Sequence, residues 1–145
     1  ASLRHVRPVF LDTGYVIALE ALDDQHHGDA IRHWRETAPE LTSIVTTTYV
    51  FDEVVTFFNA CGRHQKAVEV GRRLLESRVV EMIRVNEALF EAGWSRFQAR
   101  PDKRYSLTDC VSFVVMERRD LEEALAFDHH FEQAGYRTLP AGGDT

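Results

Sequence analysis

The feature that most constrains the fold is an alternation of short apolar segments with longer helical ones. Four segments of strand length are rich in Val, Ile, Leu, Phe or Ala, namely 9–11, 43–45, 79–85 and 124–127, and 136–139 is a fifth candidate strand. Each connection between them has room for at least one helix, which a parallel strand pair requires. The pattern predicts an α/β fold with a mostly parallel sheet covered by helices on both faces.

Cap and breaker residues delimit the helices. The threonines at 46–48 supply cap oxygens for one helix and Asn86 for another, and Pro101 ends the latter. Ser106 stands three residues before Asp109, as in a capping box. We expect helices over 15–19, 25–36, 49–61, 64–77, 87–99 and 107–118. The length suits one domain over 1–145, in which 140–145 form a loose tail.

The composition excludes several classes of protein. No apolar run approaches the roughly 20 residues of a membrane helix, and the first ten residues lack the apolar core of a signal peptide. Cys61 and Cys110 are far apart, which argues against a disulfide framework and a thiolate zinc site. The net charge of −6 argues against non-specific coating of nucleic acid, although an enzyme can contact nucleic acid at one place. We expect a cytoplasmic protein with no membrane partner.

Two acids follow short apolar segments directly. Asp12 ends the first segment and Asp128 follows the fourth, each just before a helical turn. The carboxyl ends of parallel strands form the edge where α/β proteins bind ligands, so both carboxylates are expected to face that crevice. The alternative is that each aspartate only caps the helix after it.

Two further acids lie in expected helices. Glu53 falls within an apolar stripe at helical spacing, formed by Val50, Val54, Phe57, Phe58 and Cys61. Its neighbour Asp52 lies in a polar row, and water alone explains it. A buried ion pair with an arginine is the alternative for Glu53, because an unpaired buried carboxylate is too costly. Asp109 opens a helix that is apolar nearly all round, and a cap with Ser106 is its alternative.

Electrostatics decide what these four carboxylates can bind if they converge. Two like charges about 4 Å apart repel by about 4 kcal/mol at an effective dielectric constant of about 20, so the group needs cations or protons. Oxygen donors of this kind suit Mg²⁺ or Mn²⁺, as one ion or two. Such a site can activate water and stabilise the leaving oxygen of a phosphodiester.

Four segments carry a resemblance to a known family. VFLDTGYVIAL, TTTYVFDEVVTFF, YSLTDCVSFVVM and ALAFDHHFEQAGY resemble, in order and spacing, the motifs of PIN-domain nucleases, most closely the VapC-type toxins of bacterial toxin–antitoxin pairs. The resemblance implies a three-layer α/β/α fold, Mg²⁺- or Mn²⁺-dependent endoribonuclease activity on RNA, a homodimer and a small antitoxin partner. It assigns the catalytic and metal-binding roles to Asp12, Glu53, Asp109 and Asp128.

Two positions depart from the family pattern. Gly14 stands where the family usually carries Ser or Asn, and Ala126 where it usually carries Thr or Ser. Both replacements remove a group that could orient a carboxylate or a water. One alternative is therefore a catalytically weakened module that binds RNA or protein. Another is an aspartyl-phosphate phosphatase or receiver-like domain, although the second aspartate that such a phosphatase needs is missing two residues after Asp12.

A basic segment is the candidate substrate surface. Arg96, Arg100, Lys103 and Arg104 are interleaved with Trp94, Phe97 and Tyr105, an arrangement that can hold phosphates and stack unpaired bases. Thr13, next to Asp12, is a further candidate for substrate binding. The spacing favours the alternative that Trp94 and Phe97, together with Phe90, belong to the core and that 100–104 form a solvated loop.

Neither the histidines nor any known sequence motif for nucleotide binding or serine hydrolysis points to another chemistry. Neighbouring residues on a helix point about 100° apart, so the adjacent pairs at 26–27 and 129–130 are not expected to chelate one ion. His129 is the best exception because it follows Asp128. No P-loop, G-x-G-x-x-G or G-x-S-x-G sequence is present, which removes the usual nucleotide-binding and serine-hydrolase interpretations.

Overall fold

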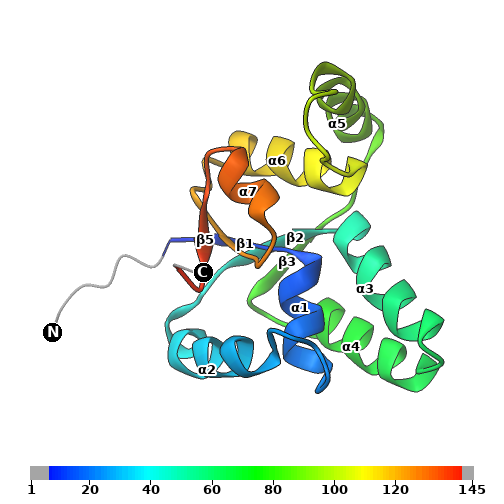
Figure 1. Ribbon diagram of the computed structural model, residues 1–145, viewed down its shortest axis with the longest axis vertical. Helices are drawn as coiled ribbons and strands as arrows, with labels where there is room; N and C mark the ends of the chain where they lie inside the picture. Colours follow the sequence, from blue (N-terminus) through cyan, green and yellow to red (C-terminus); the bar gives the residue numbers. More distant parts are fainter. Residues whose placement is uncertain (1–6, 142–145) are drawn as a thin grey trace, which may run out of the picture.

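A computed structural model describes residues 7–141 and shows a three-layer α/β/α fold (Figure 1). Helices α1, α2 and α4 lie below the central sheet in this view, and α5, α6 and α7 lie above it. The strands are β1 (Val9–Leu11), β2 (Ile44–Thr47), β3 (Val80–Ile83), β4 (Glu123–Leu125) and β5 (Arg137–Leu139). The helices are α1 (Thr13–Glu20), α2 (His27–Thr37), α3 (Thr48–Ala60), α4 (His64–Glu76), α5 (Glu87–Ala99), α6 (Leu107–Arg119) and α7 (His129–Gln133).

The sheet has five parallel strands in the order β3-β2-β1-β4-β5. The chain builds outward from β1 to β3, then crosses to the other side of β1 to place β4. Phe10 pairs with Ala124 and Leu11 with Leu125, so β1 and β4 end side by side. This is the point where the strand order reverses, and ligands of open α/β sheets bind outside the strand ends at such a point.

The expected fold class and all five expected strands are confirmed, with shifts at the ends. The helix expected over 25–36 is α2, which continues into a short 3-10 turn at Ala38–Glu40 that includes Pro39. Of the threonines at 46–48, Thr47 and Thr46 have different roles. Thr47 caps α3 by accepting a hydrogen bond from the Val50 N–H at 3.2 Å. Thr46 is still in β2 and donates its hydroxyl to the Leu11 carbonyl at 2.8 Å, which ties β2 to β1.

Helix α6 forms the centre of the core. Its residues 109–116 are all buried, as expected for a helix that is apolar nearly all round. Strand β1 is also buried throughout, and it lies between the β2 and β4 strands that α6 helps to cover. Acids at the end of β1 and the start of α6 are therefore shielded from water.

The expected face of α3 was wrong at two positions. Val50, Val54 and Phe58 are buried, but Phe57 is 39% exposed and Cys61 is exposed. The buried stripe is therefore narrower than the apolar sequence pattern. Glu53 lies at the edge of this stripe and is half-buried, rather than within it.

The expectation that the aromatic residues of α5 belong to the core was also wrong. Phe90, Trp94 and Phe97 are 38%, 42% and 40% exposed, and the rings of Trp94 and Phe97 stack on each other. Helix α5 packs on α6 through its other face. A Cβ on Gly93 would lie 2.5 Å from Val111 Cγ2, so glycine permits the close approach of the two helices.

No helix within residues 7–141 is long and apolar enough to cross a membrane. The expected loose tail over 140–145 lies mostly outside the described residues, which end at 141. The assignment of 1–145 to one domain stays a prediction, although all five described strands share one sheet.

Candidate metal site

Asp12 lies at the carboxyl end of β1 and precedes α1. Its side chain makes no cap hydrogen bond to α1, so capping does not explain the residue. It is only 6% exposed. Burial is the largest of the effects that together raise the pKa of Asp12 to about 8; the charges of Asp109, Asp128 and Glu53 also raise it, and one backbone hydrogen bond at Thr13 opposes them. We call Asp12, Glu53, Asp109 and Asp128 the acidic site, because the other three acids lie within electrostatic reach of Asp12.

Glu53 reaches this site from the first half of α3. Its Oε1 accepts a hydrogen bond of 2.7 Å from the hydroxyl of Thr13, the first residue of α1. Substrate binding by Thr13 stays a prediction, and in the structure its hydroxyl donates to Glu53. The expected alternative of a buried ion pair finds no support, because no lysine or arginine among residues 7–141 pairs with Glu53.

Asp109 lies in the first turn of α6 and is 7% exposed. It completes the expected capping box. Its Oδ2 accepts a hydrogen bond of 3.0 Å from the Ser106 N–H, and its own N–H donates to Ser106 Oγ at 2.9 Å. Capping therefore accounts for the place of Asp109 in its helix. It does not account for the proximity of Asp109 to Asp12, because the two residues belong to different elements.

Asp128 follows β4 and is the N-cap of α7. Its Oδ1 accepts a hydrogen bond of 2.8 Å from the His130 N–H, so the capping alternative also holds here. Its side chain is more exposed than that of Asp12 or Asp109. Asp128 thus forms the open side of the acidic site, and Asp12 and Asp109 form its buried side.

His130 is the residue of this site that the sequence did not single out. Its Nδ1 lies 2.8 Å from Asp109 Oδ2 and 3.3 Å from Asp128 Oδ1. His129, the expected exception, has a side chain that is 87% exposed and lies beside Glu132 instead. The expected cap at Asp128 is the sequence feature that could have identified His130. An aspartate at the N-cap folds back over the second residue of its helix, and here that residue is His130.

The side chains present fit a divalent cation. The acidic site offers carboxylate oxygens, and within residues 7–141 its ion pairs are made with His130 and not with lysine or arginine. One donor atom each from Asp109, Asp128 and His130 lie within 4.8 Å of one another. Burial and the neighbouring carboxylates raise the pKa of Asp12, and a hard cation with oxygen ligands would favour its ionised form.

Gly14 and Ala126, the two departures from the family pattern, both lie close to this site in the chain. A Cβ on Gly14 would lie 3.8 Å from Asp12 Oδ2, so a larger side chain there would contact this carboxylate without a clash. Ala126 is buried between the end of β4 and Asp128. No acid of the site is displaced by either residue.

The basic segment, residues 96–104, is divided by its contacts. Arg96 pairs with Glu117 on the outer part of α6, and Arg100 pairs with Asp102 at 3.2 Å. Lys103 and Arg104 have no ion pair with any residue of 7–141. The segment leads to Tyr105, whose ring packs edge-on against His130 with 5.4 Å between ring centroids. The end of the basic segment therefore adjoins the acidic site.

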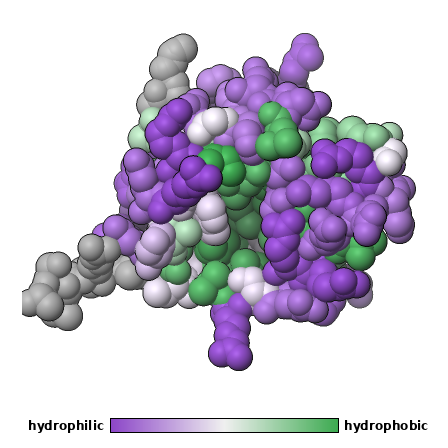
Figure 2. All heavy atoms as spheres, turned by 90° about the horizontal axis from the view of Figure 1, so that it is seen from below, coloured by the Kyte–Doolittle hydropathy of each residue, from purple (hydrophilic) through white to green (hydrophobic). Residues whose placement is uncertain are grey.

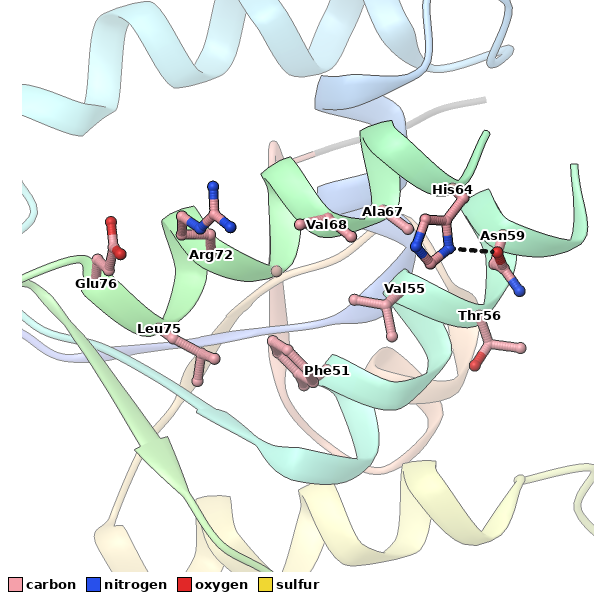
Figure 3. A pocket seen from close by; sticks show the side chains of 11 residues that line it. Phe51, Val55, Thr56, Asn59, His64, Ala67, Val68, Arg72, Leu75 and Glu76 are labelled. Carbon is pink, nitrogen blue, oxygen red and sulfur yellow. Dashed lines mark hydrogen bonds between the residues drawn. The ribbon is translucent and has the colours of Figure 1, made fainter. Parts of the chain in front are cut away.

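A separate hollow lies between α3 and α4 (Figure 3). This groove of about 630 Å³ has an apolar floor that includes Phe51, Val55 and Leu75. Its rim includes His64, whose Nδ1 is 3.0 Å from Asn59 Oδ1. None of the four acids lines it. Viewed from below, the face that carries α1, α2 and α4 also shows a central hydrophobic furrow between hydrophilic borders (Figure 2). The acidic site is distinct from the α3–α4 groove.

Comparison with known proteins places this geometry in a family. The family model described as PIN domain matches residues 9–135. VapC20 of Mycobacterium tuberculosis, named a 23S rRNA-specific endonuclease in strains CDC 1551 / Oshkosh and ATCC 25618 / H37Rv, is 33% identical over 128 residues, which are 88% of this chain and 95% of the relative. A crystal structure of VapC20, described as a sarcin-ricin loop cleaving toxin, matches with a TM-score of 0.80 and 31% identity and covers 88% of this chain and 95% of that one.

The chain belongs to the PIN-domain family, a family of nucleases. Within it, the match to VapC20 identifies the VapC type, whose members are ribonuclease toxins of toxin–antitoxin systems. PIN nucleases generally use a divalent metal, which agrees with the acidic site. The resemblance seen in the sequence motifs is thereby confirmed.

Proposed function

We propose that this protein is an endoribonuclease that uses Mg²⁺ or Mn²⁺, as one ion or two, held by Asp12, Glu53, Asp109 and Asp128. One observation carries the proposal. The four carboxylates come from four separate elements, yet Asp12 and Asp109 are buried together and donor atoms of Asp109 and Asp128 lie within 4.8 Å of each other; burial and then the three other acids raise the pKa of Asp12. Carboxylates gathered in this way without lysine or arginine partners need a cation in order to ionise together.

The residues have distinct parts in this chemistry. A bound divalent cation supplies an acidified water and neutralises the charge that develops at the phosphate. Asp12 would bind such a cation in its ionised form, although burial raises its pKa in the metal-free protein. Thr13 holds Glu53, and Ser106 holds Asp109, so both carboxylates are oriented before the substrate binds. Lys103 and Arg104 are free to contact the phosphates of the RNA beside the site.

The substrate we propose is an exposed loop of ribosomal RNA. The support is the likeness to VapC20, which is named for 23S rRNA and described as cleaving the sarcin-ricin loop. Unpaired bases of a loop can stack on aromatic side chains, and arginine and lysine beside them hold the backbone. A ribosomal substrate would also support our expectation that the protein acts in the cytoplasm.

The VapC type supports two proposals about partners. We expect a small antitoxin protein that inhibits the nuclease, and we expect a homodimer. Membership of the PIN family also favours a nuclease over the alternative of an aspartyl-phosphate phosphatase or receiver-like domain. A weakened catalyst remains a second candidate, because Gly14 leaves the position beside the Asp12 carboxylate without a side chain.

The test is cleavage of ribosomes and of protein-free ribosomal RNA, with mapping of the cut ends. Purified protein is incubated with Mg²⁺, Mn²⁺ or EDTA. We expect a discrete cut in a loop with either ion and none with EDTA. Cleavage that persists in EDTA would overturn the metal-dependent mechanism. Absence of cleavage of both substrates with both ions, by protein that still binds RNA, would establish the weakened module instead.

A further inference from the structure

His130 brings a nitrogen atom to a site that otherwise offers carboxylate oxygens. The residue lies on α7, which is anchored by the fully buried Phe131. The edge-on contact with Tyr105 fixes the plane of its ring. Its Nδ1, rather than its Nε2, faces the acids, at 2.8 Å from Asp109 Oδ2 and 3.3 Å from Asp128 Oδ1.

These distances match the spacing of donors around one ion. Neighbouring ligands of an octahedral ion with bonds of about 2.1 Å are about 3.0 Å apart. The two distances from Nδ1 lie on either side of that value, and all three donor atoms lie within 4.8 Å of one another. The three donor atoms are therefore close enough together to share a small divalent cation.

We propose that His130 Nδ1 is a cation ligand together with Asp109 and Asp128, and that this mixed nitrogen and oxygen set makes the position prefer Mn²⁺ to Mg²⁺. Imidazole nitrogen is a good ligand for first-row transition ions, whereas Mg²⁺ takes oxygen almost exclusively. The inference rests on the proposed function, because it concerns the same acidic site. It adds the identity of the ion that the site selects.

The step is balanced in protons. The Nδ1 of His130 and Oδ2 of Asp109 are 2.8 Å apart, so one proton lies between them in a hydrogen bond. A cation held by both atoms would take the place of that proton, which would leave to solvent, and the ring N–H would then be at Nε2, with the Nδ1 lone pair facing the ion.

The experiment is pulsed EPR of Mn²⁺ bound to the full chain, purified without a histidine tag. A directly bonded imidazole gives ¹⁴N modulation of the Mn²⁺ echo. We expect this modulation in the wild type and in His129→Ala, the neighbouring histidine that faces solvent. We expect its loss in His130→Gln. The same variants are titrated with Mn²⁺ and Mg²⁺, and His130→Gln should lower the affinity for Mn²⁺ by about tenfold or more while changing that for Mg²⁺ much less.

A second measurement uses the wild-type sequence, so it does not require that a variant folds. Wild-type protein in which only the histidines carry ¹⁵N should show the ¹⁵N pattern in place of ¹⁴N. Mn²⁺ that binds without nitrogen modulation would overturn the role of His130 and leave the proposed function intact, provided that the same preparation cleaves RNA with Mg²⁺. A wild type that binds neither ion would overturn both.

Discussion

The acidic site and the basic segment differ in how their charges are held. Three of the four acids have a polar partner that fixes the side chain: Thr13 for Glu53, Ser106 for Asp109 and the His130 N–H for Asp128. The basic segment lies on the surface, and two of its four cations are paired with acids of their own neighbourhood. The acids are thus preorganised and have no lysine or arginine partner within residues 7–141, whereas the cations lie at the surface and are partly neutralised.

The comparison teaches where function is specified in this fold. A buried group of like charges is costly unless something binds to it, so its presence points to a ligand. Exposed cations cost little, and they can serve solubility as readily as binding. The first region should therefore control catalysis, and the second should adjust affinity for RNA.

The largest effect is expected from Asp12→Asn. The amide keeps the size of the side chain but removes the most buried negative charge of the site, so RNA cleavage should fall by about a hundredfold or more. Initial rates on a loop substrate with Mg²⁺ measure the effect. Asp52→Asn is the matched control, because Asp52 lies next to Glu53 but is exposed and bonded to Thr56. Equal rates for Asp12→Asn and the wild type would contradict the claim that the acidic site controls catalysis.

The stability of the metal-free protein should depend on pH in an unusual direction. The pKa of Asp12 is raised from 3.8 to about 8 in the folded state, so the folded protein binds this proton more tightly than the unfolded chain does. The free energy of unfolding should then fall as pH rises from about 4 to about 8, by a few kcal/mol from this group. Urea denaturation across this range measures the slope.

Two controls sharpen the pH experiment. Asp12→Asn should remove most of the fall in stability, and saturating Mn²⁺ should oppose it, because the cation stabilises the ionised form. A slope that is the same in Asp12→Asn and in the wild type would show that another group is responsible.

A smaller effect is expected from Thr13→Val. This change removes the hydroxyl that bonds Glu53 at 2.7 Å and keeps the shape of the side chain. Stability should fall by about 1 kcal/mol, and cleavage by roughly tenfold through the loss of carboxylate orientation. Thr56→Val is the control, because its hydroxyl bonds the exposed Asp52. Similar losses in both variants would contradict a positioning role for Thr13.

The smallest effects are expected in the basic segment. Lys103→Ala and Arg104→Ala should each weaken RNA binding a fewfold and reduce the salt slope of binding by about one, with the cleavage rate at saturating RNA unchanged. Arg100→Ala should do less, because its guanidinium is paired with Asp102. Binding isotherms at several salt concentrations measure these slopes, and an Arg100→Ala effect larger than the other two would reverse the assignment.

Much of the fold and part of the site could be predicted from the sequence. The strand segments and the acids that follow them can be recognised locally in the sequence. Short strands that alternate with helices predict a parallel sheet, and the acids then lie at the edge formed by the carboxyl ends of its strands. The convergence of Asp12 with Asp109 also follows from topology, because β1 and the start of α6 meet at that edge.

The rest depends on packing that one sequence does not display. Trp94 and Phe97 are apolar and at helical spacing, but α5 approaches α6 closely at Gly93, and both aromatic rings are partly exposed. The choice of His130 over His129 depends on the cap at Asp128. The hydrogen bond from Thr13 to Glu53 joins α1 to α3 through two residues that are 40 positions apart in the chain.

The most direct test of the central claim is a calorimetric titration of Mn²⁺ into the wild type, Asp12→Asn and Asp52→Asn. The claim is that the four acids form a divalent-cation site. The wild type and Asp52→Asn should bind Mn²⁺ with the same affinity, and Asp12→Asn should bind it far more weakly. Binding by Asp12→Asn that equals the wild type, or no binding by the wild type, would contradict the claim.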